Sequence, residues 1–302
     1  MISWGIATGF ASALINTVGF LFNARFLLYY KSPVRLLVIS SLVMMLISLP
    51  LMIWLCPFGM IPDVWLYLGE VVFSSILFLI GQGAFFGALR FFEASRLSSL
   101  LGLKIIVLSV IFILSGGMLN WMQWSAVMLA AMAAVMLNWS GSQKSSVKGW
   151  LLLLLTLVAY SSVDMVETDL VVKMREFTGF STLRSSFAVV PLLYTSIGMI
   201  CTPALYFFKP DKGQLAKAFP YALLWLSSQV LLLCCFAFLQ PVFGNVILAT
   251  RGIFSVLIGM ILPCFGLAAL DSKIPAAMWM RRIVASLVML GAIALYSAGS
   301  MQ

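Results

Sequence analysis

Two basic side chains interrupt stretches that are otherwise apolar. Lys104 lies in LLGLKIIVLSV, residues 100–110, and Arg251 lies in ILATRGIFSVL, residues 247–257. A Lys or Arg at the centre of a membrane helix costs about 2.5–3.5 kcal/mol on insertion scales, so such a residue persists where it faces a cavity or a partner. An ammonium or guanidinium there could bind the carboxylate or phosphate of a small anionic molecule. It could equally extend to the nearer membrane surface or pair with an acid inside the protein.

Two acidic side chains lie in a third apolar stretch, AYSSVDMVETDLVVK, residues 159–173. Asp164 and Glu167 are three residues apart, which places them on one face of a helix. Because desolvation disfavours the charged form of a carboxylate, such a group can take up and release a proton near neutral pH. The two residues are therefore candidates for proton coupling, although a static ion pair with one of the basic residues would explain them as well.

Neutral polar side chains in the apolar stretches could add hydrogen bonds to a bound molecule: Asn16, Gln82, Tyr160 and Gln229. Each could instead bond a neighbouring helix, as amides and hydroxyls often do in membrane proteins. The candidate substrate-binding residues are these four together with the two bases. Two further acids, Glu70 and Asp169, lie nearer the ends of their stretches and are expected at the membrane surface, with a gating role as the alternative for Glu70.

The elements that must position these residues are membrane helices. The chain of 302 residues is 63% hydrophobic and only 9% charged, whereas a soluble domain carries about 25% charged residues. Its apolar runs reach about 20 residues, enough for a helix to cross a bilayer. The sequence therefore predicts an all-α membrane protein with ten transmembrane helices, at residues 3–22, 34–55, 65–89, 99–116, 122–139, 149–172, 185–207, 218–239, 243–263 and 278–298.

Several classes of activity lack their residues in this sequence. There is no His, which removes the commonest general base and metal ligand, and the five Cys have no zinc-like spacing. No Walker phosphate loop or GxSxG motif is present. We therefore expect no enzyme activity, no ATP-driven transport by this chain alone, and neither a cofactor nor a metal. The net charge of +9 lies mostly in short loops and is expected to face lipid headgroups rather than nucleic acid.

A polar linker at residues 141–148 divides the chain into two halves, 1–140 and 149–302, each with five predicted spans. A shift of 147 residues aligns Lys104 with Arg251. Shifts of 147 or 148 residues align further polar pairs: Gln82 with Gln229, Asn16 with Asp164, and Arg25 with Lys173. Because each half has an odd number of spans, the second half must cross the membrane in the opposite sense. The sequence thus predicts two inverted five-helix repeats, an arrangement frequent in secondary transporters.

One long run resembles the third-to-fifth-helix pattern of the drug/metabolite transporter superfamily, EamA-like branch: GAFFGALRFFEASRLSSLLGLKIIVLSVIFILSGGMLNWMQWSAVMLAAMAAVML, residues 83–137. The second half gives a looser copy, PVFGNVILATRGIFSVLIGMIL followed by MRRIVASLVMLGAIALYSAG. The resemblance covers most of the chain. It implies a ten-helix permease of the bacterial inner membrane, with helices 1, 3, 4, 6, 8 and 9 around a central cavity. The fourth, sixth and ninth predicted spans hold Lys104, Asp164 with Glu167, and Arg251, whereas the middles of the second, fifth, seventh and tenth hold no charge, which agrees with that arrangement.

Two features depart from that family. The loop between the ninth and tenth predicted spans, PCFGLAALDSKIPAAMW, is longer than its counterpart in the first half. Lys and Arg are concentrated in loops after odd-numbered spans. By the positive-inside rule this places both termini outside, whereas the family usually has them in the cytoplasm. The sequence therefore leaves two orientations open.

Together, the residues and the resemblance lead us to expect a secondary transporter that moves a small anionic or zwitterionic metabolite, such as an amino acid, by alternating access. Lys104 and Arg251 would hold the substrate, and Asp164 with Glu167 would exchange protons. Two alternatives stay open: a flippase or carrier for a lipid-linked or nucleotide-linked sugar, and a membrane assembly or sensor protein without transport. The expected partners are the substrate, the lipid bilayer and protons.

Overall fold

The structure is a computed structural model that describes residues 2–30, 32–88, 91–92, 100–138, 146–251, 253–254, 257–258 and 276–299. These residues form helices joined by turns, with no strand among them. Six of these helices are long and apolar enough to cross a membrane: Ile2–Asn23, Pro33–Leu55, Val64–Ala88, Val147–Thr178, Thr182–Tyr206 and Lys212–Leu239. The chain is therefore a helical, multi-pass membrane protein.

The six long helices coincide with six of the predicted spans, the first three and the sixth to eighth. The predicted spans at 99–116, 122–139 and 278–298 each fall on a helix, and their crossing of the membrane stays a prediction. The predicted span at 243–263 begins in the short helix α10 (Pro241–Leu248), and its last residues, 259–263, lie outside the described part of the chain.

The chain folds into two compact units. The first unit comprises Met1–Leu79 and Val163–Gln240, and the second comprises Ile80–Ser162 and Pro241–Gln302. Each unit therefore takes helices from both of the predicted repeats. The repeats describe how the sequence is related to itself, whereas the units describe which helices pack together.

The borders between the units fall inside two continuous helices, α3 (Val64–Ala88) and α7 (Val147–Thr178). Each unit thus contains one part of α3 and one part of α7. Of the predicted linker 141–148, residues 141–145 lie outside the described part, and the linker's last residues already belong to the start of α7.

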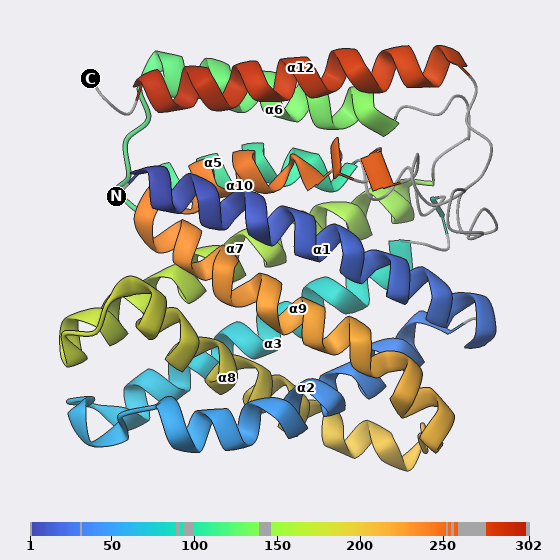
Figure 1. Cartoon of the computed structure of the whole chain (residues 1–302), viewed down its shortest axis with the longest axis vertical. Helices are drawn as coiled ribbons and strands as arrows, with labels where there is room; N and C mark the ends of the chain where they lie inside the picture. Colours follow the sequence, from blue (N-terminus) through green and yellow to red (C-terminus); the bar gives the residue numbers. More distant parts are fainter. Residues whose placement is uncertain are drawn as a thin grey trace. The chain divides into compact units, whose positions relative to one another are not determined.

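Four complete helices make up most of the first unit: α1 (Ile2–Tyr30), α2 (Pro33–Leu55), α8 (Thr182–Cys201) and α9 (Lys212–Leu239). In this unit α1 runs beside α9, and α2 packs against α8 (Figure 1). The first pair is antiparallel, because Gly5 of α1 faces Leu239 whereas Gly19 faces Leu224. Short 3₁₀ turns, η1 (Phe58–Met60) and η3 (Thr202–Tyr206), follow α2 and α8.

Local sequence signals set the ends of these helices. Ser32 and Asp211 precede α2 and α9, and their side chains accept hydrogen bonds from the backbone N–H groups of Arg35 and Gln214. Each cap satisfies a donor that has no partner within the helix. α9 ends where Gln240 adopts a φ of 70°, and the proline that follows begins a new helix, α10.

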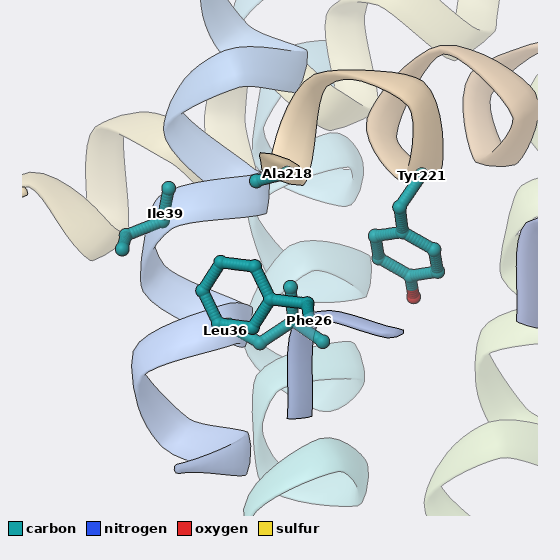
Figure 2. Close-up of a cluster of buried hydrophobic side chains, with 5 residues drawn as sticks. All are labelled: Phe26, Leu36, Ile39, Ala218 and Tyr221. Carbon is teal, nitrogen blue, oxygen red and sulfur yellow. The ribbon is translucent and has the colours of Figure 1, made fainter. Parts of the chain in front are cut away.

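An apolar cluster closes one end of the first unit. Figure 2 shows Phe26 of α1 among Leu36 and Ile39 of α2 and Ala218 and Tyr221 of α9. All five side chains are at most 8% exposed. Since lipid tails are as apolar as these residues, dispersion between closely packed atoms is what favours such contacts between membrane helices. The cluster therefore depends on complementary shape.

Close approach of backbones holds α2 to α8. A Cβ added at Gly198 of α8 would meet the Met45 side chain and lie 2.9 Å from the carbonyl oxygen of Ser41, both on α2. Glycine lets two membrane helices pack at this separation, as small residues do in helix pairs generally.

The second unit contains α5 (Lys104–Leu114), α6 (Trp121–Asn138), α10 and α12 (Ala276–Gly299). The 3₁₀ turn η2 (Leu101–Leu103) leads into α5. Within this unit α6 and α12 lie side by side, and α5 lies against α10 (Figure 1). The ring of Phe243 in α10 stacks on Tyr296 of α12 with centroids 4.6 Å apart.

We expect Gly198→Ala to lower the free energy of unfolding by about 1–3 kcal/mol, because the added methyl group overpacks the contact between α2 and α8. Gly69→Ala is the matched control, since a Cβ at Gly69 in α3 meets no atom within 4 Å. Thermal unfolding in detergent should give a lower midpoint for the first variant alone. Equal midpoints for the two variants would contradict the proposed close packing.

Candidate functional site

The structure distributes the eight candidate residues over both units. The first unit holds Asn16, Asp164, Glu167 and Gln229. The second unit holds Gln82, Lys104, Tyr160 and Arg251. α7 alone carries three of the eight, so it is the element from which the candidate site is best described.

Tyr160, Asp164 and Glu167 occupy one face of α7, because spacings of four and three residues place side chains above one another on an α-helix. α7 has 32 residues and is about 48 Å long at 1.5 Å per residue, whereas the hydrocarbon core of a bilayer is about 30 Å thick. The three residues lie near the middle of this helix. Their polar groups are therefore expected at the depth where water is scarcest.

Both carboxylates of α7 are largely removed from solvent. Asp164 is 7% exposed and Glu167 is 8% exposed. The hydroxyl of Ser74, on α3, donates to Glu167 Oε1 at 3.5 Å, which is at the long limit of a hydrogen bond. The desolvated acids expected from the sequence are thus buried side chains, and one of them has a hydroxyl partner on a second helix.

Lys104 begins α5 and lies against α7. Its Nζ is 5.8 Å from the centroid of the Tyr160 ring, within the range of a cation–π interaction. The hydroxyl of Ser161, next along α7, donates to the backbone carbonyl of Lys104 at 3.4 Å. Two adjacent residues of α7 therefore contact Lys104, one at its ammonium group and one at its backbone, and this fixes the start of α5 on α7.

The ring of Tyr160 also marks where α3 and α7 approach each other. A Cβ added at Gly81 of α3 would lie 2.8 Å from two carbons of that ring. Gln82, the next residue of α3, is half-buried. The second unit thus brings Lys104 onto Tyr160 and places Gln82 beside the glycine that Tyr160 contacts.

Asn16 lies in the contact between α1 and α9. Its Nδ2 donates to Ser228 Oγ at 3.4 Å, and Ser12, one turn earlier, donates to the Ser228 carbonyl at 2.9 Å. Asn16 is 4% exposed, and its Oδ1 has no hydrogen-bond partner among the described residues. The Nδ2 of this amide therefore serves helix packing, and its Oδ1 is a buried acceptor without a hydrogen-bond partner among the described residues.

The remaining two candidates are Gln229 and Arg251. Gln229 is half-buried and follows Ser228, the residue that bonds α1. Arg251 is half-buried in the second unit, three residues beyond the end of α10. The structure therefore puts both amides, Gln82 and Gln229, beside a helix–helix contact.

One cluster of charges was foreseen only in part. Lys173 Nζ of α7 lies 2.7 and 2.9 Å from the carboxylate oxygens of Glu70 in α3, and 2.7 Å from Asp169 Oδ2. The spacing of Asp169 and Lys173, four residues apart on one helix, is a recognisable sequence signal for an ion pair. Nothing in the sequence indicates that Glu70, which is 103 positions from Lys173, is the second partner of this lysine.

Comparison with known proteins gives the fold and no name for an activity. No protein-family model matches the chain, and no curated protein matches it. One solved chain, described only as "Crystal structure of protein", aligns with 97% of this chain and 96% of its own length, with a TM-score of 0.65 and 12% sequence identity. The chain therefore shares its fold with that solved chain over almost its whole length.

We expect Asn16→Leu to change the free energy of unfolding by less than about 1 kcal/mol, because removal of a buried oxygen without a described partner offsets the loss of the 3.4 Å hydrogen bond to Ser228. Ser228→Leu is the matched comparison. Ser228 is fully buried and bonded to α1, so overpacking there should cost about 1–3 kcal/mol. Thermal unfolding of both variants checks this. A loss at Asn16→Leu as large as that at Ser228→Leu would mean that Oδ1 is occupied.

Proposed function

We propose that this protein is a secondary transporter that moves a small anionic or zwitterionic metabolite, such as an amino acid, across a bacterial inner membrane by alternating access. The proposal places it in the EamA-like branch of the drug/metabolite transporter superfamily, which the sequence resembles. The observation that carries it is the middle of α7, where one helix face holds two buried carboxylates and an aromatic ring that a lysine contacts.

Groups of this kind are too costly in a membrane to serve packing alone. A buried Asp or Glu at bilayer depth is rare and usually faces a pathway or a partner. Asp164 and Glu167 can exchange protons, and Lys104 and Arg251 can neutralise a carboxylate or phosphate on the substrate. The amides Gln82 and Gln229, the Tyr160 hydroxyl and the unpartnered Oδ1 of Asn16 would then fix the substrate's orientation through neutral hydrogen bonds.

The register of helix contacts supports inverted repeats. In the first unit α1 meets α9 at Ser12 and Ser228. The repeat shifts of 148 and 147 relate Ser12 to Tyr160 and Ser228 to Gly81, and these two residues are in contact where α7 meets α3 in the second unit. If two related repeats pack by exchanging helices, a helix contact in one unit is expected at the related positions of the other unit.

A second contact recurs in the same way. Gly5 of α1 faces Leu239 of α9 in the first unit. The same shifts relate these residues to Leu153 and Phe92, which belong to one apolar cluster of the second unit. Inverted repeats of this type provide two related conformations, each open to one side of the membrane, around a site near the midplane.

The repeats differ in the groups that would couple transport to protons. Positions 16 and 19 hold Asn and Gly in α1, whereas the related positions hold Asp164 and Glu167 in α7. Proton exchange would therefore be confined to one repeat. Protonation of α7 when the site faces the more acidic side, and release on the other side, would make one direction of transport favourable.

A ligand-induced thermal-stability screen tests substrate binding, with amino acids, nucleotides and sugar phosphates as probes. We expect an amino acid or another small carboxylate to raise the melting temperature of the wild-type protein. Lys104→Ala and Arg251→Ala should each weaken apparent affinity by tenfold or more, because a charged hydrogen bond contributes about 1.5–3 kcal/mol. Lys148→Ala, at an exposed position, is the matched control.

Each outcome of the screen has a distinct meaning. Stabilisation by nucleotides or sugar phosphates alone would favour the sugar carrier over the amino-acid carrier. A ligand that stabilises all variants equally would remove Lys104 and Arg251 from the site. No stabilisation by any probe, together with lower melting temperatures for both variants, would favour a protein that assembles or senses without transport.

Flux measurements in proteoliposomes test the acids. We expect Asp164→Asn and Glu167→Gln to abolish uptake driven by a pH gradient while leaving exchange of substrate between the two sides measurable, because exchange needs no net proton movement. Glu176→Gln, an exposed acid on the same helix, should retain gradient-driven uptake. Unchanged gradient-driven uptake in both α7 variants would exclude these residues from proton coupling.

A further inference from the structure

The ammonium group of Lys173 joins α3 to α7 at one end of the first unit. Lys173 Nζ contacts both oxygens of Glu70 at 2.7 and 2.9 Å, and Asp169 Oδ2 at 2.7 Å. The side chains of Lys173 and Glu70 are only 32% and 29% exposed. One ammonium group therefore holds a carboxylate of its own helix and a carboxylate of its neighbour.

The repeat places opposite chemistry at the related positions. The shift of 147 relates Glu70 to Lys217, and the shift of 148 relates Lys173 to Arg25. Both related residues are basic, so the ion pair between α3 and α7 cannot recur between α9 and α1. Lys217 Nζ instead lies over the rings of Tyr29 and Tyr30, at 3.7 and 5.1 Å from their centroids.

These two contacts lie at opposite ends of the first unit. We call the end with Glu70 and Lys173 the α3–α7 end, and the end with Lys217, Tyr29 and Tyr30 the α1–α9 end. Tyr29 and Tyr30 end α1 and immediately precede α2, whereas Glu70 lies in the second turn of α3, which follows α2. α2 has 23 residues and is therefore about 34 Å long, enough to cross a bilayer core about 30 Å thick. The apolar cluster of Figure 2 lies at the α1–α9 end, and Tyr30 packs against it.

We propose that Glu70, Lys173 and Asp169 form a latch that closes the α3–α7 end, and that the like charges Arg25 and Lys217 leave the α1–α9 end without an equivalent latch. Charge-assisted bidentate contacts are stronger than a cation resting on aromatic rings. Opening the α1–α9 end separates the apolar cluster of Figure 2 and the cation–π contacts of Lys217, whereas opening the α3–α7 end also breaks an ionic bridge. In the absence of substrate we therefore expect the conformation that is closed at the α3–α7 end to predominate. The inference rests on the proposed alternating access.

The latch raises the free energy needed to open the α3–α7 end, which is one half of the proposed transport cycle. Opening the α3–α7 end separates Lys173 from Glu70, while Asp169 stays beside Lys173 because both lie on α7. Closing that end again re-forms the bridge without help from the substrate. The empty carrier consequently returns faster than it opens, and the side that offers substrate to the resting protein is the α1–α9 side.

Distance measurements between spin labels at Leu66→Cys and Phe177→Cys test the latch directly. Both positions are exposed and lie at the α3–α7 end, and the five native cysteines are replaced by alanine in all samples. With the native charges, we expect the shorter distance to predominate. Glu70→Gln should raise the population at longer distance at least threefold, and the swapped pair Glu70→Lys with Lys173→Glu should restore the short distance.

A second variant acts from the other end. Lys217→Glu places an acid where the repeat puts the partner of Arg25, so a latch at the α1–α9 end becomes available and the longer Leu66–Phe177 distance should again increase. Melting temperatures of all variants confirm that each is folded. Unchanged distances in Glu70→Gln, or a swapped pair that behaves like Glu70→Gln, would overturn the latch.

The two proposals fail in different ways. If the wild-type protein carries out flux while the distances ignore every charge substitution, alternating access stands and the latch is wrong. If the distances respond to charge as expected but no probe is transported, the latch stands as a structural switch and the proposed transport is wrong. The spin-label readout needs no knowledge of the substrate, so it remains decisive in both cases.

Discussion

A bilayer interior offers no water to a polar group, and the structure of this protein follows from that constraint. The backbone satisfies itself by forming helices, and polar side chains must find partners on neighbouring helices. Ser12 and Ser228 join α1 to α9, and the hydroxyl of Tyr67 donates to the carbonyl of Leu170 at 2.9 Å to join α3 to α7. Apolar surfaces in lipid would allow helices to slide along each other, whereas these bonds have one register. The few polar residues therefore set the alignment of a chain that is mostly apolar.

The long apolar helices were predictable from the sequence, and so was the burial of Asp164 and Glu167, because both depend on local composition and spacing. The pairing of helices was not, since any apolar helix is compatible with many neighbours. Serine is common in membrane helices, so nothing singled out Ser228 before its contacts with α1 were visible. Lys104 was expected at a ligand, an acid or the membrane surface, and the structure shows that its Nζ lies 5.8 Å from the centroid of the Tyr160 ring. Contact with this ring depends on how α5 is placed against α7, which residue spacing within one span does not encode.

The proposed repeats combine related helix contacts with different side chains. Contacts at Ser12 and Ser228 recur at Tyr160 and Gly81, so the proposed repeats use the same helix-pairing positions. At those and neighbouring positions the side chains differ in polarity, size and charge. In the proposed transporter, a symmetric scaffold would supply two related conformations of similar energy, and the differing side chains would decide how unequal these conformations become. Small electrostatic differences would then set the direction of transport.

The pairing of α1 with α9 also has a consequence for biogenesis. Ser12 and Ser228 are separated by 216 positions, and at about 5–20 residues per second the ribosome needs about 10–40 s to synthesise the intervening chain. During that interval Ser12 and Asn16 reside in the membrane before their partner exists. Unsatisfied polar side chains are costly in lipid, so α1 is less stable in the membrane until α9 is made. α1 is thus synthesised long before α9 supplies the hydrogen-bond partners of its polar side chains.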